Sequence, residues 1–428
     1  VHGRVRKGKW IVMLVTLTIY YLTPWIRWDR GPAAPDQAVL IDLPGRRFYF
    51  FFIEIWPQEV YYVTGLLILA AVGLFLVTAV AGRVWCGYTC PQTVWTDLFI
   101  LVERLVEGDR AERIRLDKKK WTLAKLGRRA LKHTLWLLIA LATGGAWVFY
   151  FADAPTLAAD LASFDAPTVA YAFIGILTFT TYWLGGHMRE QVCTYMCPWP
   201  RIQGAMLDEE SMVVTYRDFR GEPRGPMKKG GEQLFGDCID CKQCVVACPM
   251  GIDIRDGQQL ECITCALCID ACDDVMRKVG RPTGLIAYDT IGNLERRAKG
   301  EPTRIRILRA RTILYAMVLV LVAGIMLFAF STRSDTEINL LNDRNPLFVT
   351  LSDGSIRNGY TVKLLNMIPE PRQFRLSIDG LSGAVMFSED LHQPEGRSFA
   401  IDVDPDRLRT LKFFVVQPAP AVQPGPTD

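Results

Sequence analysis

The sequence has little of several features that common protein classes require. Histidine occurs only four times, and no cysteine follows Cys272 in a chain of 428 residues. Positive and negative charges nearly cancel, at 49 Lys and Arg against 45 Asp and Glu, so no nucleic-acid partner is expected. Twelve cysteines are too few per residue for a small disulfide scaffold. With 50% hydrophobic and 22% charged residues, the chain is neither disordered nor a typical soluble enzyme, and its length predicts more than one domain.

Long apolar runs, by contrast, are abundant. Five of them approach the roughly 17–25 residues that cross a bilayer core, and none contains Lys or Arg. Trp or Tyr marks several of their ends, as at a membrane interface. We therefore predict transmembrane helices over residues 10–26, 60–81, 134–151, 167–185 and 312–330. Buried helices of a large soluble protein are the alternative, against which the charged flanks of all five runs argue.

The first run lies so near the start of the chain that a signal peptide is a second interpretation of it. Four basic residues precede it, but no small-residue cleavage site follows. The chain begins with Val1 rather than Met, so we expect further residues upstream.

The charges of the connecting loops predict how the spans are oriented. Segment 82–133 carries twelve Lys and Arg, whereas segment 152–166 carries three Asp and no basic residue. By the positive-inside rule, the N-terminus and segments 82–133 and 186–311 are cytoplasmic. The tail 331–428 is then periplasmic, in a multi-pass protein of the bacterial inner membrane.

Two other segments have a clear period. In 92–107 apolar residues recur at helical spacing ahead of a basic run, which predicts a helix on the cytoplasmic membrane surface. Beyond the fifth run, stretches such as 360–366 and 373–378 are typical of strands and are separated by turn residues. About seven short strands in this cysteine-free tail predict an immunoglobulin-like β-sandwich.

Eight cysteines repeat the spacing of a bacterial two-cluster ferredoxin, C-x2-C-x2-C-x3-C. In such a pair of motifs, three cysteines hold one cubane and the fourth reaches the other cluster. The first predicted [4Fe–4S] cluster is held by Cys238, Cys241, Cys244 and Cys272. The second is held by Cys262, Cys265, Cys268 and Cys248. Two structural zinc sites are the alternative, which the doubled spacing disfavours.

The second ferredoxin motif departs from the pattern in one respect. Cys272 is followed by Asp273 and Asp274, where the first motif has Pro249. Negative charge beside a cluster disfavours its reduction, so we expect a lowered potential there.

The remaining four cysteines form a second repeat, C-x-Y-x-C-P, in which Cys86 pairs with Cys90 and Cys193 with Cys197. Each copy follows an apolar run on the predicted cytoplasmic side, so a duplicated two-helix unit would bring the pairs together. Residues i and i+4 share a helix face, so each pair can offer two sulfurs to one point.

Several roles are open to these four thiols. Soft thiolates favour Cu(I), zinc or another iron–sulfur centre. Buried reduced cysteines and a dithiol/disulfide couple are the alternatives. His187, Met188 and Met196 are further candidate ligands, although packing is the more common role of such residues.

Together these motifs resemble the FixG/RdxA/CcoG family of cytochrome c oxidase accessory proteins. The resemblance is carried by residues 83–95, 193–203, 221–225 and 262–272, and it covers nearly the whole chain. The expected fold is a multidomain membrane protein with an α-helical bundle of five transmembrane helices, an inserted bacterial-type 2[4Fe–4S] ferredoxin domain and a C-terminal immunoglobulin-like β-sandwich. Its parts are 1–185 with four spans, 186–311 with the ferredoxin domain at about 230–290, the fifth span 312–330 and the tail 331–428.

The resemblance also implies a function. Such proteins are implied to reduce Cu(II) to Cu(I) for the catalytic centre of the cbb3-type oxidase, with copper handled by Cys86, Cys90, Cys193 and Cys197. The implied cofactors are two [4Fe–4S] clusters and copper. The expected partners are a cytoplasmic electron donor, copper chaperones or a copper transporter, the cbb3-type oxidase assembly machinery, the lipid bilayer and a second copy of the chain as a homodimer.

Two other functions are compatible with the same motifs. One is an electron conduit that takes its electrons from quinol. The other is a non-enzymatic copper-binding assembly factor whose clusters are structural or sense the redox state.

Overall fold

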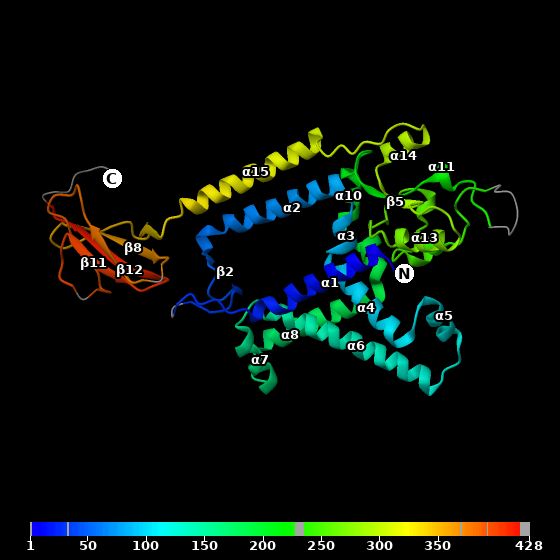
Figure 1. Cartoon of the computed structure of the whole chain (residues 1–428). Coiled ribbons are helices and arrows are strands. Elements are labelled where there is room, and N and C mark those ends of the chain that lie inside the picture. The colour runs from blue at the N-terminus through cyan, green and yellow to red at the C-terminus, as the bar shows by residue number, and fades with distance from the viewer. Residues whose placement is uncertain (1, 32–33, 227–234, 369, 392, 420–428) are drawn as a thin grey trace. The chain divides into compact units, whose positions relative to one another are not determined.

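The computed structural model describes residues 2–31, 34–226, 235–368, 370–391 and 393–419 (Figure 1). The chain forms two compact units, one made of Val1–Ile26 and Gln37–Met326, the other of Arg27–Asp36 and Leu327–Asp428. The predicted start of the ferredoxin domain, near residue 230, lies outside the described residues.

Four helical stretches among the described residues are long and apolar enough to cross a membrane: Pro57–Ala81, Leu123–Val148, Thr168–Met196 and Ala310–Ser331. They contain α2 (Tyr61–Ala81), α6 (Leu123–Val148), α8 (Thr168–Thr181) and α15 (Ala310–Ser331), so the chain is a membrane protein (Figure 1). The first predicted span forms α1 (Arg4–Leu22) and a 3-10 turn, Thr23–Trp25. α1 is not one of the four, because basic residues occupy its first turns, and a fifth span stays a prediction.

Two helices extend beyond the predicted boundaries. α6 begins at Leu123 rather than near residue 134, because Thr122 caps it and the Lys125 ammonium donates to the carbonyls of Asp117 and Lys119. The fourth span continues past residue 185 through π-helical segments Tyr182–Met188 and Val192–Met196, joined by α9 (Arg189–Gln191). Hydropathy misses both extensions, since polar and charged residues occupy them.

α6 is the centre of helix packing in the first unit. A Cβ on Gly144 of α6 would lie 2.9 Å from the Ile174 carbonyl of α8, so glycine permits this close approach. The helix predicted over 92–107 forms as α4 (Pro91–Glu107). Its Phe99 ring stacks on Trp136 of α6 with centroids 5.3 Å apart. Much of the apolar face of α4 therefore contacts protein, and its placement on the membrane surface stays a prediction.

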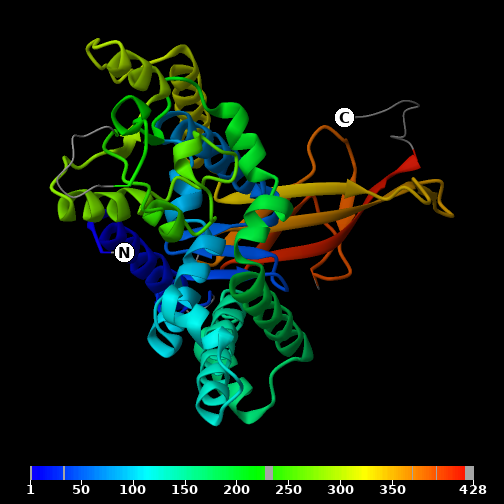
Figure 2. The ribbon, with the colours of Figure 1, turned by 90° about the vertical axis from the view of Figure 1, so that its right-hand side faces the viewer.

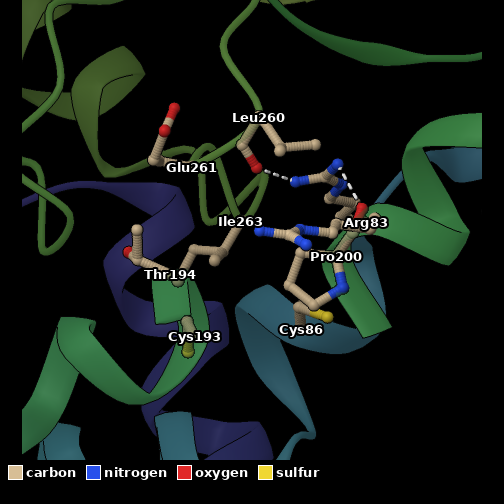
Figure 3. Close-up of a pocket in the computed structure, with 9 residues that line it drawn as sticks. Arg83, Cys86, Cys193, Thr194, Pro200, Leu260, Glu261 and Ile263 are labelled. Atoms are coloured by element: carbon tan, nitrogen blue, oxygen red, sulfur yellow. Dashed lines mark hydrogen bonds between the residues drawn. The ribbon is translucent and has the colours of Figure 1, made fainter. Parts of the chain in front are cut away.

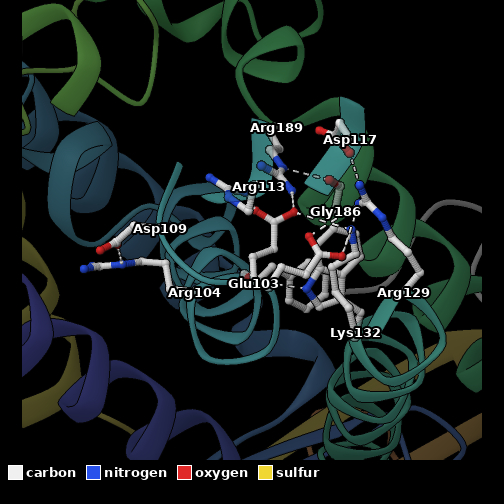
Figure 4. Close-up of polar contacts among 12 residues, drawn as sticks. Glu103, Arg104, Asp109, Arg113, Asp117, Arg129, Lys132, Gly186 and Arg189 are labelled. Carbon is white, nitrogen blue, oxygen red and sulfur yellow. Dashed lines mark hydrogen bonds and ion pairs between the residues drawn. The ribbon is translucent and has the colours of Figure 1, made fainter. Parts of the chain in front are cut away.

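A buried ion-pair network holds the π-helical segments in place (Figure 4). Glu103 and Glu107 of α4 are 4% and 2% exposed. Lys132 of α6 lies 3.2 Å from Glu107, and Arg189 lies 2.6 Å from Glu103. Buried charges need such partners, so the network fixes the chain just before Cys193.

A small sheet that the sequence did not predict lies between α1 and α2. Strands β1 (Val39–Asp42), β2 (Arg47–Phe50) and β3 (Ile53–Ile55) pair antiparallel in that order. The Ile41 amide donates to the Tyr150 carbonyl over 2.7 Å, which attaches the sheet to the C-terminal end of α6, just before α7 (Ala154–Ser163).

The cysteine-rich part of the first unit is built on one antiparallel strand pair, β4 (Val213–Tyr216) with β5 (Ile286–Asp289). Between these strands lie α11 (Asp218–Gly221), α12 (Gln243–Ala247) and α13 (Leu267–Lys278), and α14 (Ile291–Ala298) follows. The Asp270 carboxylate of α13 accepts the backbone amides of Val5 and Arg6 over 3.3 and 2.8 Å. It thereby caps the first turn of α1, and Figures 1 and 2 show α1 beginning beside this segment.

The second unit contains two antiparallel sheets. One has the order β10 (Val385–Phe387), β12 (Arg407–Gln417), β8 (Ile356–Asn366) and β6 (Thr336–Asn342), with β7 (Val349–Thr350) also on β8; the other pairs β11 (Ser398–Val403) with β9 (Arg372–Ser377). On β11, Phe399, Ile401 and Val403 are buried while their neighbours are exposed. The seven described strands and their alternation confirm the predicted β-sandwich.

Candidate iron–sulfur and thiolate site

Two loops with the same backbone pattern present the cysteines of the C-x2-C-x2-C motifs. In the first loop Asp240 and Lys242 have φ of 52° and 55°; in the second, Thr264 and Ala266 have φ of 54° and 59°. Each pair flanks the middle cysteine of its motif. The left-handed backbone conformation costs a residue other than glycine roughly 1–2 kcal/mol. Four such residues therefore indicate that the two loops are held in a specific shape. Such turns direct backbone amides toward one point and form the anion-binding nests of many iron–sulfur sites.

The fourth cysteine of each motif lies with the first three of the other motif. Cys262, Cys265 and Cys268 line one cavity together with Cys248, which follows α12, and Cys244 of the other set lines it as well. Cys272 of α13 is buried in the same cluster as Cys238 and Cys244. Its thiol interacts electrostatically with Cys244, Cys241 and Cys238. These neighbourhoods are compatible with the two ligand sets predicted from the spacing, and the assignment of each cysteine to a cluster stays a prediction.

The chemistry of these thiols fits a cluster. Burial raises the pKa of Cys244 and Cys265 to about 11 and that of Cys272 to about 12. Thiolates at such places need a cation, which iron supplies. Within the described ranges, no three Cys, His, Asp or Glu side chains lie at ligating distance of one point, so the fit rests on neighbourhood, backbone shape and donor chemistry.

Arg255 is a residue near these thiols that the sequence did not indicate. Its Nη1 lies 3.8 Å from Cys238 Sγ as a donor, and Asp253 and Asp240 each hold the guanidinium at 2.6 Å. Donors to a ligand sulfur tune a cluster's potential. No motif could have revealed Arg255, because the contact depends on how the 3-10 turn Ile254–Asp256 folds back.

The two C-x-Y-x-C-P motifs end with the same backbone hydrogen bond, although the first lies on an α-helix and the second on a π-helical segment. Cys86 lies on α3 (Val84–Tyr88), and the Cys90 amide donates to the Trp85 carbonyl over 2.9 Å. In the second copy, the Cys197 amide donates in the same way to Val192 over 2.8 Å. After each motif another helix begins, α4 at Pro91 and α10 (Trp199–Met206) behind Pro198.

The helix of each motif ends at its second cysteine. The second cysteine of each pair is the residue at which the helix ends, because Cys90 and Cys197 have ψ of 129° and 122°, and the shared helical face of each pair stays a prediction. A residue before proline is driven out of the helical region, so each of these cysteines leaves the helix.

The structure brings the two motifs together. Cys86, which is 8% exposed, and Cys193 line one pocket with Arg83, Arg201 and Ile263 (Figure 3). Burial, together with the negative charges of Cys90, Cys193 and Cys197, raises the pKa of Cys86 to about 12. Cys86, Cys90, Cys193 and Cys197, called the membrane-edge cysteines below, are therefore electrostatic neighbours.

The other candidate ligands do not line this pocket. His187 lies in an aromatic cluster, with its ring centroid 5.2 Å from Trp183 and 5.3 Å from Tyr182. The Met196 residue is 55% exposed. The described residues that line this pocket do not include His187, Met188 or Met196. Packing or exposure to solvent explains where these three side chains lie.

Gln203 orients Cys86. The Cys86 thiol donates to Gln203 Oε1 over 3.0 Å, and Gln203 Nε2 donates to the Thr78 hydroxyl over 3.1 Å. Gln203 is fully buried, so its amide is available only to these groups. The sequence-based ligand search missed Gln203 because an amide is not a soft ligand.

The membrane-edge thiols directly adjoin the loop of the second cysteine set. Cys86, Ile263, Cys265 and Leu267 share one buried cluster. A Cβ on Gly87 would lie 2.7 Å from the Ile263 carbonyl and 3.0 Å from the Cys265 amide nitrogen. The backbones of the two motifs are therefore in contact, and only glycine fits between them.

We expect Gly87→Val to displace the loop of Cys262, Cys265 and Cys268. The added side chain meets backbone atoms, which cannot move aside as a flexible side chain can. Purified protein should lose the iron and sulfide of one cluster. Gly127→Val on α6 is the matched control, because a Cβ at that helical position meets nothing within 4 Å. Equal iron in both variants would contradict the contact.

Family models match three parts of the chain. A 4Fe–4S dicluster domain matches residues 188–291, and a 4Fe–4S binding domain matches residues 63–107. The IG-like fold at the C-terminal of FixG matches residues 326–428, which agrees with the β-sandwich of the second unit. No solved structure matches the chain.

Curated relatives match over most of their length. The chain is 58% identical to nitrogen fixation protein FixG of Rhizobium meliloti over 446 residues, covering 97% of this chain and 85% of the relative. It is 56% identical to protein RdxA and 59% identical to protein RdxB of Cereibacter sphaeroides, covering 90% and 88% of this chain and 82% and 80% of those proteins. With its iron–sulfur domains and membrane helices, the chain belongs to the FixG/RdxA family of membrane-bound iron–sulfur oxidoreductases.

Proposed function

We propose that this chain reduces Cu(II) to Cu(I) at its membrane-edge cysteines and thereby supports assembly of the copper centre of cbb3-type cytochrome c oxidase. The observation that carries the proposal is the pocket lined by Cys86 and Cys193, which directly adjoins the loop of Cys265. An electron-transfer module and a cluster of soft ligands are in contact there. One electron converts one Cu(II) to Cu(I), and thiolate ligation favours the reduced ion.

The residues divide into three roles. Cys86, Cys90, Cys193 and Cys197 bind the copper substrate. The two ferredoxin sets hold the clusters, which when bound store and pass single electrons. Cys241 is exposed, whereas Cys265 is 7% exposed and lies against the Cys86 segment. Electrons from a cytoplasmic donor therefore enter at the first set and leave at the second.

The direct test is anaerobic formation of Cu(I) by pre-reduced protein, followed with a chromogenic Cu(I) chelator. Replacing all four membrane-edge cysteines with Ser should abolish both copper binding and Cu(I) formation while both clusters remain. Tyr195→Phe is the matched control inside the second motif, because Tyr195 is 77% exposed. Copper reduction that survives in the Ser variant would contradict the proposal.

A second function has a specific observation in its favour. The family model matching residues 63–107 is a 4Fe–4S binding domain, yet the only cysteines in that segment are Cys86 and Cys90. A third iron–sulfur centre at the membrane edge would explain this match. Iron and sulfide analysis separates the two candidates, since a third centre adds the iron of one more cluster, which the Ser variant loses.

A further inference from the structure

Arg83 joins three segments on the proposed electron route from the second cysteine set to the membrane-edge cysteines. They are its own segment and the two to which it donates hydrogen bonds. Its Nη1 donates to the carbonyls of Leu260 and Cys262, at 3.4 Å for the latter, in the loop of the second cysteine set. Its Nη2 donates to the Pro200 carbonyl over 2.6 Å, just after the second C-x-Y-x-C-P motif. Figure 3 shows the guanidinium between the carbonyls of Leu260 and Pro200, above Cys86. A Cβ on Gly204 would lie 3.1 Å from Nη2, so the surroundings are tight.

The charge of Arg83 has no direct counter-ion in the part of the chain that the structure describes. Arg83 is 3% exposed, its guanidinium donates only to carbonyls, and Nε is buried without a partner. Across the described residues, no carboxylate forms an ion pair with it; exposed Glu261, at the same pocket, interacts at longer range. A cation removed from water in this way requires a nearby anion.

The groups that can supply this negative charge lie on both sides of Arg83. Burial lowers the pKa of Arg83, and the negative charges of Cys86, Cys262 and Glu261 oppose that shift. Cys86 belongs to the membrane-edge set and Cys262 to the second ferredoxin set. Both become thiolates when they bind metal. Arg83 thus lies between two sites that each gain negative charge.

We infer that Arg83 is the shared counter-ion of the second iron–sulfur cluster and the membrane-edge thiolates, and that its charge raises the potential of that cluster. The inference rests on the proposed electron route. A fixed positive charge stabilises the extra electron on the cluster and keeps it beside the thiol site. Moving the electron from one side of Arg83 to the other leaves it close to the same cation, which reduces the electrostatic cost of the transfer.

The test is a redox titration of copper-free protein, with each cluster followed by electron paramagnetic resonance. Arg83→Gln should make reduction of one cluster at least about tenfold less favourable, a shift of about 59 mV for one electron, and leave the other in place. Arg83→Lys, which keeps the charge, should shift the potential much less. Arg201→Gln is the matched control, because Arg201 lines the same pocket but is exposed.

Two results overturn the inference: unchanged potentials in Arg83→Gln, or equal shifts in the Gln and Lys variants. If Arg83→Gln does not load its clusters, reconstitution of Arg83→Ala with added guanidinium or urea decides the matter. Guanidinium should restore loading and urea, a neutral molecule of the same shape, should not; equal effects reject a role of charge. Because copper is absent throughout, failure here is distinguishable from failure of Cu(II) reduction.

Discussion

Replacing Cys248 with Ala removes the cluster of the second motif and leaves that of the first, although Cys248 belongs to the first motif in sequence. The reason is its position, since it lines the cavity of Cys262, Cys265 and Cys268. Cys272→Ala has the converse effect, because Cys272 is buried beside Cys238 and Cys244. Each variant should retain the iron and sulfide of one cluster.

Matched pairs of variants make this result specific. Cys248→Ala should give the same residual spectrum as Cys262→Ala, and Cys272→Ala the same as Cys244→Ala. Met250→Leu is the control, because it alters the wall of the same cavity without removing a thiol. If Cys248→Ala instead matches Cys244→Ala, each motif holds its own cluster and the assignment is wrong.

Cys248→Ala should also separate reduction of the clusters from Cu(I) formation, and so distinguish the two ends of the proposed electron route. In Cys248→Ala the remaining cluster, at the set containing exposed Cys241, still accepts electrons from a soluble reductant. The loop next to Cys86 then lacks its cluster. Cu(I) formation should therefore stop even though reducible iron remains.

Removing iron with a chelator should destabilise residues 213–226 and 235–289 and leave the C-terminal sandwich folded. The buried core of the cysteine-rich segment includes Cys238, Cys244 and Cys272, and its loops hold four left-handed residues that are not glycine. Without metal these features have little to stabilise them. The sandwich core contains no cysteine and is formed by residues such as Phe399, Ile401 and Phe413.

Hydrogen exchange measures this difference directly. Amides in 213–289 should lose protection after iron removal, while those of β8, β11 and β12 keep it. Loss of protection in both regions, or in neither, would contradict a structural dependence confined to the cysteine-rich segment.

The metal-free segment should also become less stable as pH rises. Burial raises the pKa of Cys244 and Cys265 from 9.0 to about 11 and that of Cys272 to about 12, so the folded metal-free chain retains protons that the unfolded chain releases. The stabilisation is fully present below pH 9 and disappears toward pH 11–12. Denaturant titrations of iron-free protein at pH 7 and pH 10 should show this fall, whereas greater stability at pH 10 would contradict it.

Local spacing determined much of this protein. The ligand sets predicted for the two clusters come from a repeat in which a few residues of loop present three sulfurs, and the neighbourhoods of Cys248 and Cys272 are compatible with them. The four long apolar helices were recognisable because membrane spans depend on length and composition alone. The alternation on β11 can also be recognised in the sequence, because the two-residue side-chain period of a strand is a local property.

Only the tertiary structure decided how these parts meet. Arg83, Gly87 and Gln203 gained their roles from contacts with segments more than a hundred residues away, and no local pattern encodes such contacts. The π-helical continuation of the fourth span depends on Arg189 reaching Glu103 of α4. The short spacing within each motif predicts which of its sulfurs can share a metal. Packing between α3, α10 and the Cys262–Cys268 loop decided that the two kinds of thiol site adjoin, because contact between distant segments depends on the whole fold.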